Sequence, residues 1–203
     1  MSSSPSHRFG FLMFPAFEEL DLIGPWEMAT MWRDYAGGPT CVSVSERGGD
    51  IACAKGLATR ADHSFETCPP LDYLLVPGGI ATRQEVNNER LVGWLAERGE
   101  RCQHVLSVCT GSFLLQAAGL LQGRTATTHW LAREAFAALP DVTLTTARWH
   151  RDGNVWTSAG VSAGMDLLLA FIAALDGEEA AETVQRGAEY YPDGRIYGRP
   201  PAA

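Results

Sequence analysis

The feature that most constrains the fold is an alternation of short apolar runs with longer segments of helical periodicity. We expect strands in the short runs and helices in the periodic segments. The expected strands cover 9–14, 41–45, a hairpin arm within 51–59, 73–76, 104–108, 125–128 and a hairpin at 148–157. The expected helices cover 25–35, 89–98, 112–121, 131–139, 162–175 and 178–187.

Strands that alternate with helices predict βαβ crossovers, and therefore a mostly parallel sheet covered on both faces. We expect one α/β sandwich domain over residues 8–203, preceded by a serine-rich, disordered lead-in at 1–7. Ligands of such sheets bind beyond the carboxyl ends of the strands. The residues that directly follow each strand are therefore the first candidates for function.

The composition excludes several classes of protein. Sixteen Lys and Arg against 24 Asp and Glu give a net charge of −8, which disfavours binding to nucleic acid or to an anionic membrane. The longest apolar runs, such as Leu167–Leu175, are shorter than the ~20 residues that span a membrane. The first residues lack the apolar stretch of a secretion signal, and five scattered cysteines lack zinc-ligand spacing. We expect a cytoplasmic protein with reduced thiols and no metal site.

Cys109 stands where an apolar strand, 104–108, meets a helix that begins near Ser112. Small residues lie two positions to either side, at Ser107 and Gly111, as in the sharp turn of a nucleophile elbow. The partial positive charge of a helix N-terminus favours the thiolate, which is the reactive form. We interpret Cys109 as a nucleophile, and the other four cysteines as small core residues.

Asp21 is the candidate proton-transfer partner of Cys109. It is flanked by apolar residues at Leu20 and Leu22, and burial beside a thiolate raises the pKa of a carboxyl. The sequence around Asp21 leaves open a second interpretation, in which Asp21 caps a helix before Gly24 and Pro25. We expect Glu18 and Glu19 to be solvated.

Two further turns are ambiguous. Pro77-Gly78-Gly79 follows a strand and offers bare backbone amides to an anionic centre, although such a turn is also common in ordinary loops. His129 follows a short strand and is either a base or, as we prefer, a structural histidine beside Trp130.

Together these segments resemble the ThiJ/PfpI superfamily, whose members are similar to class I glutamine amidotransferase domains. The resemblance is specific within the isocyanide hydratase branch, through LDLIGP, SVCTGS and ATTHW. The matching segments are FPAFEELDLIGPWE (14–27), DYLLVPGG (72–79), SVCTGSFLLQAAGLLQGRTATTHW (107–130) and RDGNVWTSAGVSAGMD (151–166).

The resemblance implies a flavodoxin-like sandwich that forms homodimers. It assigns Cys109 as the nucleophile, Asp21 as its acid, Thr110 as the residue that orients this acid, and Gly79 and Thr110 as sources of the oxyanion amides. It also implies a mobile helix start at Gly160 and Val161, which shifts when the cysteine is modified. This resemblance favours the acid over the capping interpretation of Asp21.

The activity implied is hydration of an isocyanide to an N-substituted formamide, with a small-molecule substrate and no cofactor. Two alternatives stay open. One is a non-catalytic or redox-responsive ligand sensor of the same superfamily. The other is a thiol enzyme that acts on glyoxals or amides, which Thr110 disfavours because related enzymes place a histidine directly after the cysteine.

Overall fold

The computed structural model describes residues 7–192 of the 203-residue chain, so six residues of the expected lead-in and residues 193–203 of the expected domain lie outside it. The strands of the main sheet are β1 (Arg8–Met13), β2 (Thr40–Ser45), β5 (His63–Ser64), β6 (Tyr73–Val76), β7 (His104–Val108), β10 (Trp149–Asp152) and β11 (Val155–Ser158). Two small pairs are formed by β3 (Gly49–Ala52) with β4 (Ala58–Ala61) and by β8 (Arg124–Ala126) with β9 (Val142–Leu144).

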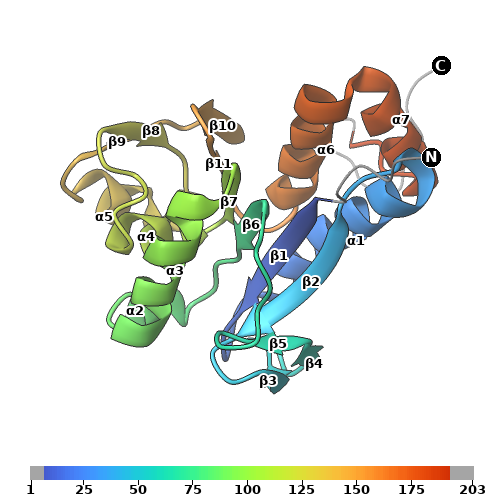
Figure 1. Cartoon of the computed structure of the whole chain (residues 1–203). Coiled ribbons are helices and arrows are strands. Elements are labelled where there is room, and N and C mark those ends of the chain that lie inside the picture. The colour runs from blue at the N-terminus through green and yellow to red at the C-terminus, as the bar shows by residue number, and fades with distance from the viewer. Residues whose placement is uncertain (1–6, 193–203) are drawn as a thin grey trace.

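Helices cover both faces of this sheet, so the chain forms three layers (Figure 1). Helices α1, α6 and α7 pack together on one side, and α3 and α4 lie on the other. The helices are α1 (Glu19–Ala36), α2 (Thr82–Glu85), α3 (Glu89–Arg101), α4 (Gly111–Ala117), η1 (Trp130–Ala132), α5 (Arg133–Ala137), α6 (Ala163–Asp176) and α7 (Glu178–Gly187).

The main sheet has the strand order β10-β11-β7-β6-β1-β2-β5 within the described residues. Every neighbouring pair is parallel except β10 with β11, which form the antiparallel hairpin expected at 148–157. The central strands are apolar because helices cover them on both sides, and Phe9, Leu75 and Leu106 are fully buried. The predicted mostly parallel sandwich is confirmed.

Helix α1 begins six residues earlier than the expected helix over 25–35, and Pro25 lies inside it. The expectation was wrong because a proline lacks the N–H for a helical hydrogen bond and usually marks a first turn. Here Pro25 contacts α6 so closely that a Cβ on Gly164 would lie 2.9 Å from its Cγ. The earlier start places Asp21 in the first turn of α1.

The β3–β4 hairpin fixes the loop between β1 and α1. The Ala16 N–H donates to the Ala52 carbonyl at 2.8 Å, and the Ala54 N–H donates to the Phe17 carbonyl at 2.9 Å. Lys55, at the tip of the hairpin, forms an ion pair with Glu18. The loop before α1 is therefore bonded along its length, which sets where Asp21 enters the helix.

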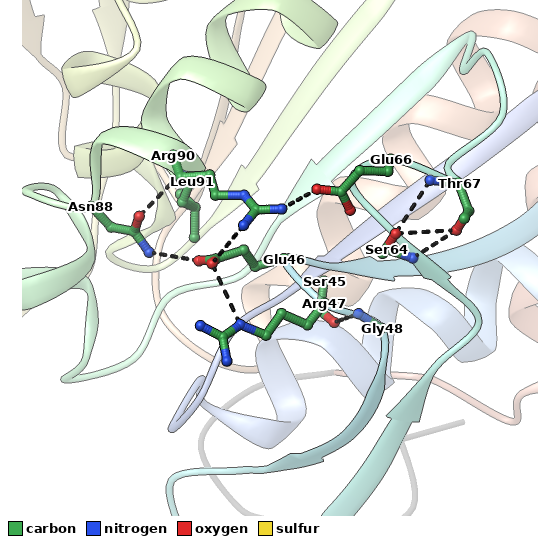
Figure 2. Close-up of polar contacts among 10 residues, drawn as sticks. All are labelled: Ser45, Glu46, Arg47, Gly48, Ser64, Glu66, Thr67, Asn88, Arg90 and Leu91. Carbon is green, nitrogen blue, oxygen red and sulfur yellow. Dashed lines mark hydrogen bonds and ion pairs between the residues drawn. The ribbon is translucent and has the colours of Figure 1, made fainter.

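Glu46, directly after β2, joins three segments in a polar network (Figure 2). Its carboxylate accepts a hydrogen bond from the Asn88 side chain at 3.3 Å and lies 3.6 Å from the Arg90 guanidinium and 3.8 Å from that of Arg47. Arg90 also pairs with Glu66. These contacts hold the start of α3 against the end of β2.

In residues 7–192 no helix has the length and apolar character to cross a membrane.

Candidate functional site

The loops after β1, β6, β7 and β11 meet at one edge of the sheet, because parallel strands present their carboxyl ends together. They contribute Glu18, Gly79, Cys109 and Val161 to one cavity of about 370 Å³. The residues that follow these strands, which were the first candidates for function, thus line one cavity at the carboxyl edge of the sheet.

Cys109 lies at a strained turn between β7 and α4. Its φ is 57°, in the left-handed region that residues with a Cβ rarely adopt. Gly111 permits the turn, since a Cβ there would lie 2.3 Å from the Val76 carbonyl oxygen. The Cys109 N–H is shared between the Ser158 and Ala159 carbonyls, at 3.1 Å from each. The expected elbow geometry is therefore present, with its strain held by the end of β11.

Asp21 is fully buried, and backbone amides from two distant loops bind its carboxyl group. The Gly78 N–H donates to Oδ2 at 3.0 Å and the Val161 N–H donates to Oδ1 at 3.1 Å. Its oxygens thus bind other loops instead of capping its own helix, so the capping interpretation is wrong. The acid joins the loops after β6 and β11 to the first turn of α1.

Asp21 and Cys109 form a coupled pair. Burial raises the pKa of Asp21 from its ordinary 3.8 to about 7, while the Gly78 N–H and the Cys109 thiol oppose the rise. Burial, and then the charge of Asp21, raise the pKa of the Cys109 thiol from 9.0 to about 12, while the amide and hydroxyl of Thr110 oppose the rise. The pair therefore loses its first proton as the pH rises through about 7 and retains the second, on sulfur, well above neutral pH.

This result differs from the expectation of a thiolate at the helix N-terminus. Cys109 is only 6% exposed, so its charged form loses most of its hydration, and the buried carboxyl next to it adds a second unfavourable charge. These two effects outweigh the short helix α4. The thiol therefore carries a proton when Asp21 is ionised.

The Thr110 hydroxyl contacts Gly79 and not Asp21. It donates to the Gly79 carbonyl and accepts from the Gly79 N–H, both at 3.0 Å. The expected orienting contact to Asp21 is therefore wrong. The Gly79 amide, expected to face an oxyanion, is bonded to this hydroxyl, and the Thr110 amide acts on the Cys109 sulfur.

Gly160 and Val161 precede α6, as the expected helix start requires. Val161 has a φ of 53° and donates its N–H to Asp21, so a strained residue is bonded directly to the acid. Movement of this helix start stays a prediction. His129 lies over Gly160, where a Cβ would come within 2.0 Å of the ring, and its Nδ1 accepts the Leu131 N–H at 3.3 Å. His129 thus contacts the segment before α6 and also lines the cavity, and its structural role stays a prediction.

Glu18 is a cavity residue that the sequence interpretation missed. We expected Glu18 and Glu19 to be solvated, but their side chains are only 21% and 14% exposed. Glu18 lines the cavity and pairs with Lys55, while the Lys55 N–H donates to Glu19 at 2.6 Å. The position of Glu18 directly before the helix that carries Asp21 is a sequence signal that it lies near the site. The pairing of Glu18 with Lys55 could not be predicted from the local sequence, because Lys55 lies on a distant hairpin.

The remaining cysteines, at 41, 53, 68 and 102, are buried, free and part of the apolar core, as expected. Burial raises the pKa of Cys41 and of Cys102 to about 12. Within residues 7–192 no group of three or more His, Cys, Asp and Glu side chains has the arrangement of a metal site.

A three-layer α/β sandwich with a cysteine at a strained strand–helix turn, beside a buried acid, defines a class of cysteine-elbow proteins. This chain belongs to the DJ-1/PfpI family, whose model matches residues 7–174. It is 34% identical over 194 residues to an isonitrile hydratase of Pseudomonas putida, which covers 91% of this chain and 79% of that protein. Isonitrile is a synonym of isocyanide.

Two further comparisons describe the range of the family. A crystal structure of a THiJ/PfpI family protein from Pseudomonas syringae is 35% identical, with a TM-score of 0.87 over 97% of this chain and 81% of that one. The HTH-type transcriptional regulator CdhR of Pseudomonas aeruginosa is 32% identical over 196 residues, which is 96% of this chain but 57% of the regulator. The fold therefore occurs both in a hydratase and in part of a regulator.

Proposed function

We propose that this chain hydrates an isonitrile, R–NC, to the N-substituted formamide R–NH–CHO, with Cys109 as the nucleophile and no cofactor. The observation that carries the proposal is the Asp21–Cys109 pair, a buried acid that titrates near neutral pH beside a thiol that lines a cavity large enough for a small molecule. The similarity to an isonitrile hydratase over most of both chains supports it.

The first step adds the Cys109 sulfur and one proton to the terminal carbon of the isonitrile. The S–C and C–H bonds form together with a C=N double bond, which gives the thioimidate Cys–S–CH=N–R. Asp21 takes the thiol proton and delivers it to this carbon, so the pair supplies both the sulfur and the hydrogen. A carboxyl whose pKa is about 7 suits this step, because it can both accept and release a proton near neutral pH.

Water then adds to the C=N bond, with its oxygen on carbon and a proton on nitrogen. The tetrahedral intermediate collapses as the C–S bond breaks, the C=O bond forms and the hydroxyl proton returns to the Asp21–Cys109 pair. The amide of Thr110, which acts on the sulfur in the resting pair, stabilises the thiolate as it leaves. The product is R–NH–CHO, and no oxidant or reductant is consumed.

The test is formamide production from a simple aryl isonitrile, followed by mass spectrometry and NMR. Wild type is expected to turn over, and Cys109→Ala to lose at least ~10²-fold in kcat, as loss of a nucleophile implies. Cys102→Ala is the matched control, because Cys102 is equally buried but outside the cavity. Absence of formamide with wild type, or full activity of Cys109→Ala, would contradict the proposal.

A ligand sensor is the second candidate, favoured by the similarity to a transcriptional regulator over nearly the whole of this chain. A sensor would bind an isonitrile or another small molecule in the cavity without releasing product. The raised pKa of Cys109 disfavours rapid oxidation by peroxide, because the thiolate is the form that oxidises. Saturable binding measured by calorimetry, with no formamide formed, would favour the sensor.

An enzyme that acts on glyoxals or amides has less support, since Thr110 stands where such enzymes carry histidine. Turnover of methylglyoxal in place of isonitriles would favour it. Homodimer formation is also a prediction, which sedimentation of the purified chain tests.

A further inference from the structure

The cavity beside Cys109 has a largely apolar wall away from the sulfur. Phe113 and Val86 form part of this wall, and η1 and α5 each add an alanine. The apolar members are Ile80, Val86, Phe113, Leu131, Ala132 and Ala135. Such a wall holds the hydrocarbon part of a ligand by burying its surface.

Two large apolar side chains at this cavity are strongly exposed. Ile80, after β6, is 70% exposed, and Leu131, in η1, is 71% exposed. They come from different segments and both line the cavity. An apolar ligand that extends outward from Cys109 would cover part of both side chains, so its body need not end inside the cavity.

Arg83, on helix α2, also lines this cavity and is exposed to solvent. Among residues 7–192, every arginine except Arg83 and Arg186 has a side-chain hydrogen bond or ion pair with another described residue. Arg47 and Arg90, bound to Glu46, illustrate the usual situation (Figure 2). In a chain with eight more acids than bases, a guanidinium at the cavity with no such partner in the described part of the chain is unusual.

The other charged groups of the cavity do not compete for Arg83. Glu18 is paired with Lys55. Burial lowers the pKa of His129 below 6.5, so this ring is mainly neutral at pH 7. The guanidinium is therefore the cation available to a ligand, and its planar donors suit the two oxygens of a carboxylate.

Building on the hydratase activity proposed above, we propose that the preferred substrate is an isonitrile with an apolar body and a terminal carboxylate, and that Arg83 binds this carboxylate. The isonitrile carbon lies at Cys109, the hydrocarbon lies against Phe113 and Val86, and the carboxylate meets α2. Arg83 is a specificity-determining residue and takes no part in bond making.

The experiment compares alkyl isonitriles that end in a carboxylate with their methyl esters, over a series of chain lengths. For wild type we expect kcat/KM to favour the acid about two- to fivefold at the best chain length, the size expected of one exposed ion pair. The preference should fall as salt increases, because salt screens exposed charges.

Variants locate this preference. Arg83→Gln should lower kcat/KM for the acid relative to that for its methyl ester, so that the ratio of the two approaches one, and Arg83→Lys should retain part of the preference. Arg186→Gln, which removes the other unpaired arginine, lies outside the cavity and should behave as wild type. Equal kcat/KM for acids and esters with wild type overturns the proposed carboxylate preference, and an equal effect of Arg83→Gln on both substrates overturns the assignment of Arg83; neither result contradicts the proposed hydratase activity. Failure to hydrate any isonitrile overturns the proposed function and this inference together.

Discussion

Replacement of Asp21 by Asn tests the environment of the buried acid most directly. The amide has nearly the same shape as the carboxyl, but its NH₂ group cannot accept a hydrogen bond. The Gly78 and Val161 amides donate to different oxygens of Asp21, so one of them would face a donor in the variant. Such a mismatch costs about 1–3 kcal/mol, and this cost does not depend on pH.

The pH-dependent part comes from the pKa of Asp21. Folding raises this pKa from 3.8 to about 7, so the folded chain binds the proton more tightly than the unfolded chain. The stabilisation due to this proton is complete below pH 3.8 and is lost as the pH rises through about 7. A rise of this size corresponds to about 4 kcal/mol, and Asn at this position has no such loss.

Urea unfolding of both proteins between pH 4 and pH 8.5 measures the difference. Asp21→Asn should have the lower free energy of unfolding at pH 4. Between pH 4 and pH 8 the difference from wild type should shift in favour of the variant by up to about 4 kcal/mol. Asp50→Asn makes the same chemical change at a side chain that is 81% exposed, and it is the surface control for the measurement. A flat difference for Asp21→Asn, or one that moves in favour of wild type as pH rises, would refute a raised pKa.

Three further predictions follow from the same site. The kcat/KM for an isonitrile should rise with pH through an apparent pKa near 7 and then stay level, since the reactive pair holds one proton. Thr110→Val should lower the free energy of unfolding by about 1–3 kcal/mol in urea titrations, because the Gly79 N–H loses its acceptor, and Thr110→Ser should restore it. Val161→Gly should be more stable than Val161→Ala by about 1 kcal/mol, because a φ of 53° strains any residue with a Cβ; equal values would argue against strain.

The elbow and the sheet were predictable because they depend on local signals. The run from His104 to Val108, followed by Cys109 and Gly111, marks a buried strand, a sharp turn and a helix within twelve residues. The order of apolar runs likewise predicts that the loops of several strands meet at one edge. The structure bears out both.

Other features of the site depend on contacts between distant residues. The partner of the Thr110 hydroxyl is 31 residues away, and the protonation of Cys109 depends on how deeply Asp21 is buried. Helix α2, which carries Arg83, has only four residues, too few for an apolar period to reveal it. The start of α1 was misjudged because the packing of Pro25 against α6 overrides the usual meaning of proline.

The two amide donors to Asp21 also set an order in the biosynthesis of the chain. Gly78 follows the acid by 57 residues and Val161 follows it by 140, so the ribosome makes the second donor long after the thiol at 109. Until that stretch has emerged and docked, the nascent polypeptide has its sulfur but not the finished surroundings of its acid. The hydrogen bonds around this acid are therefore complete only after residue 161 has been made and has docked.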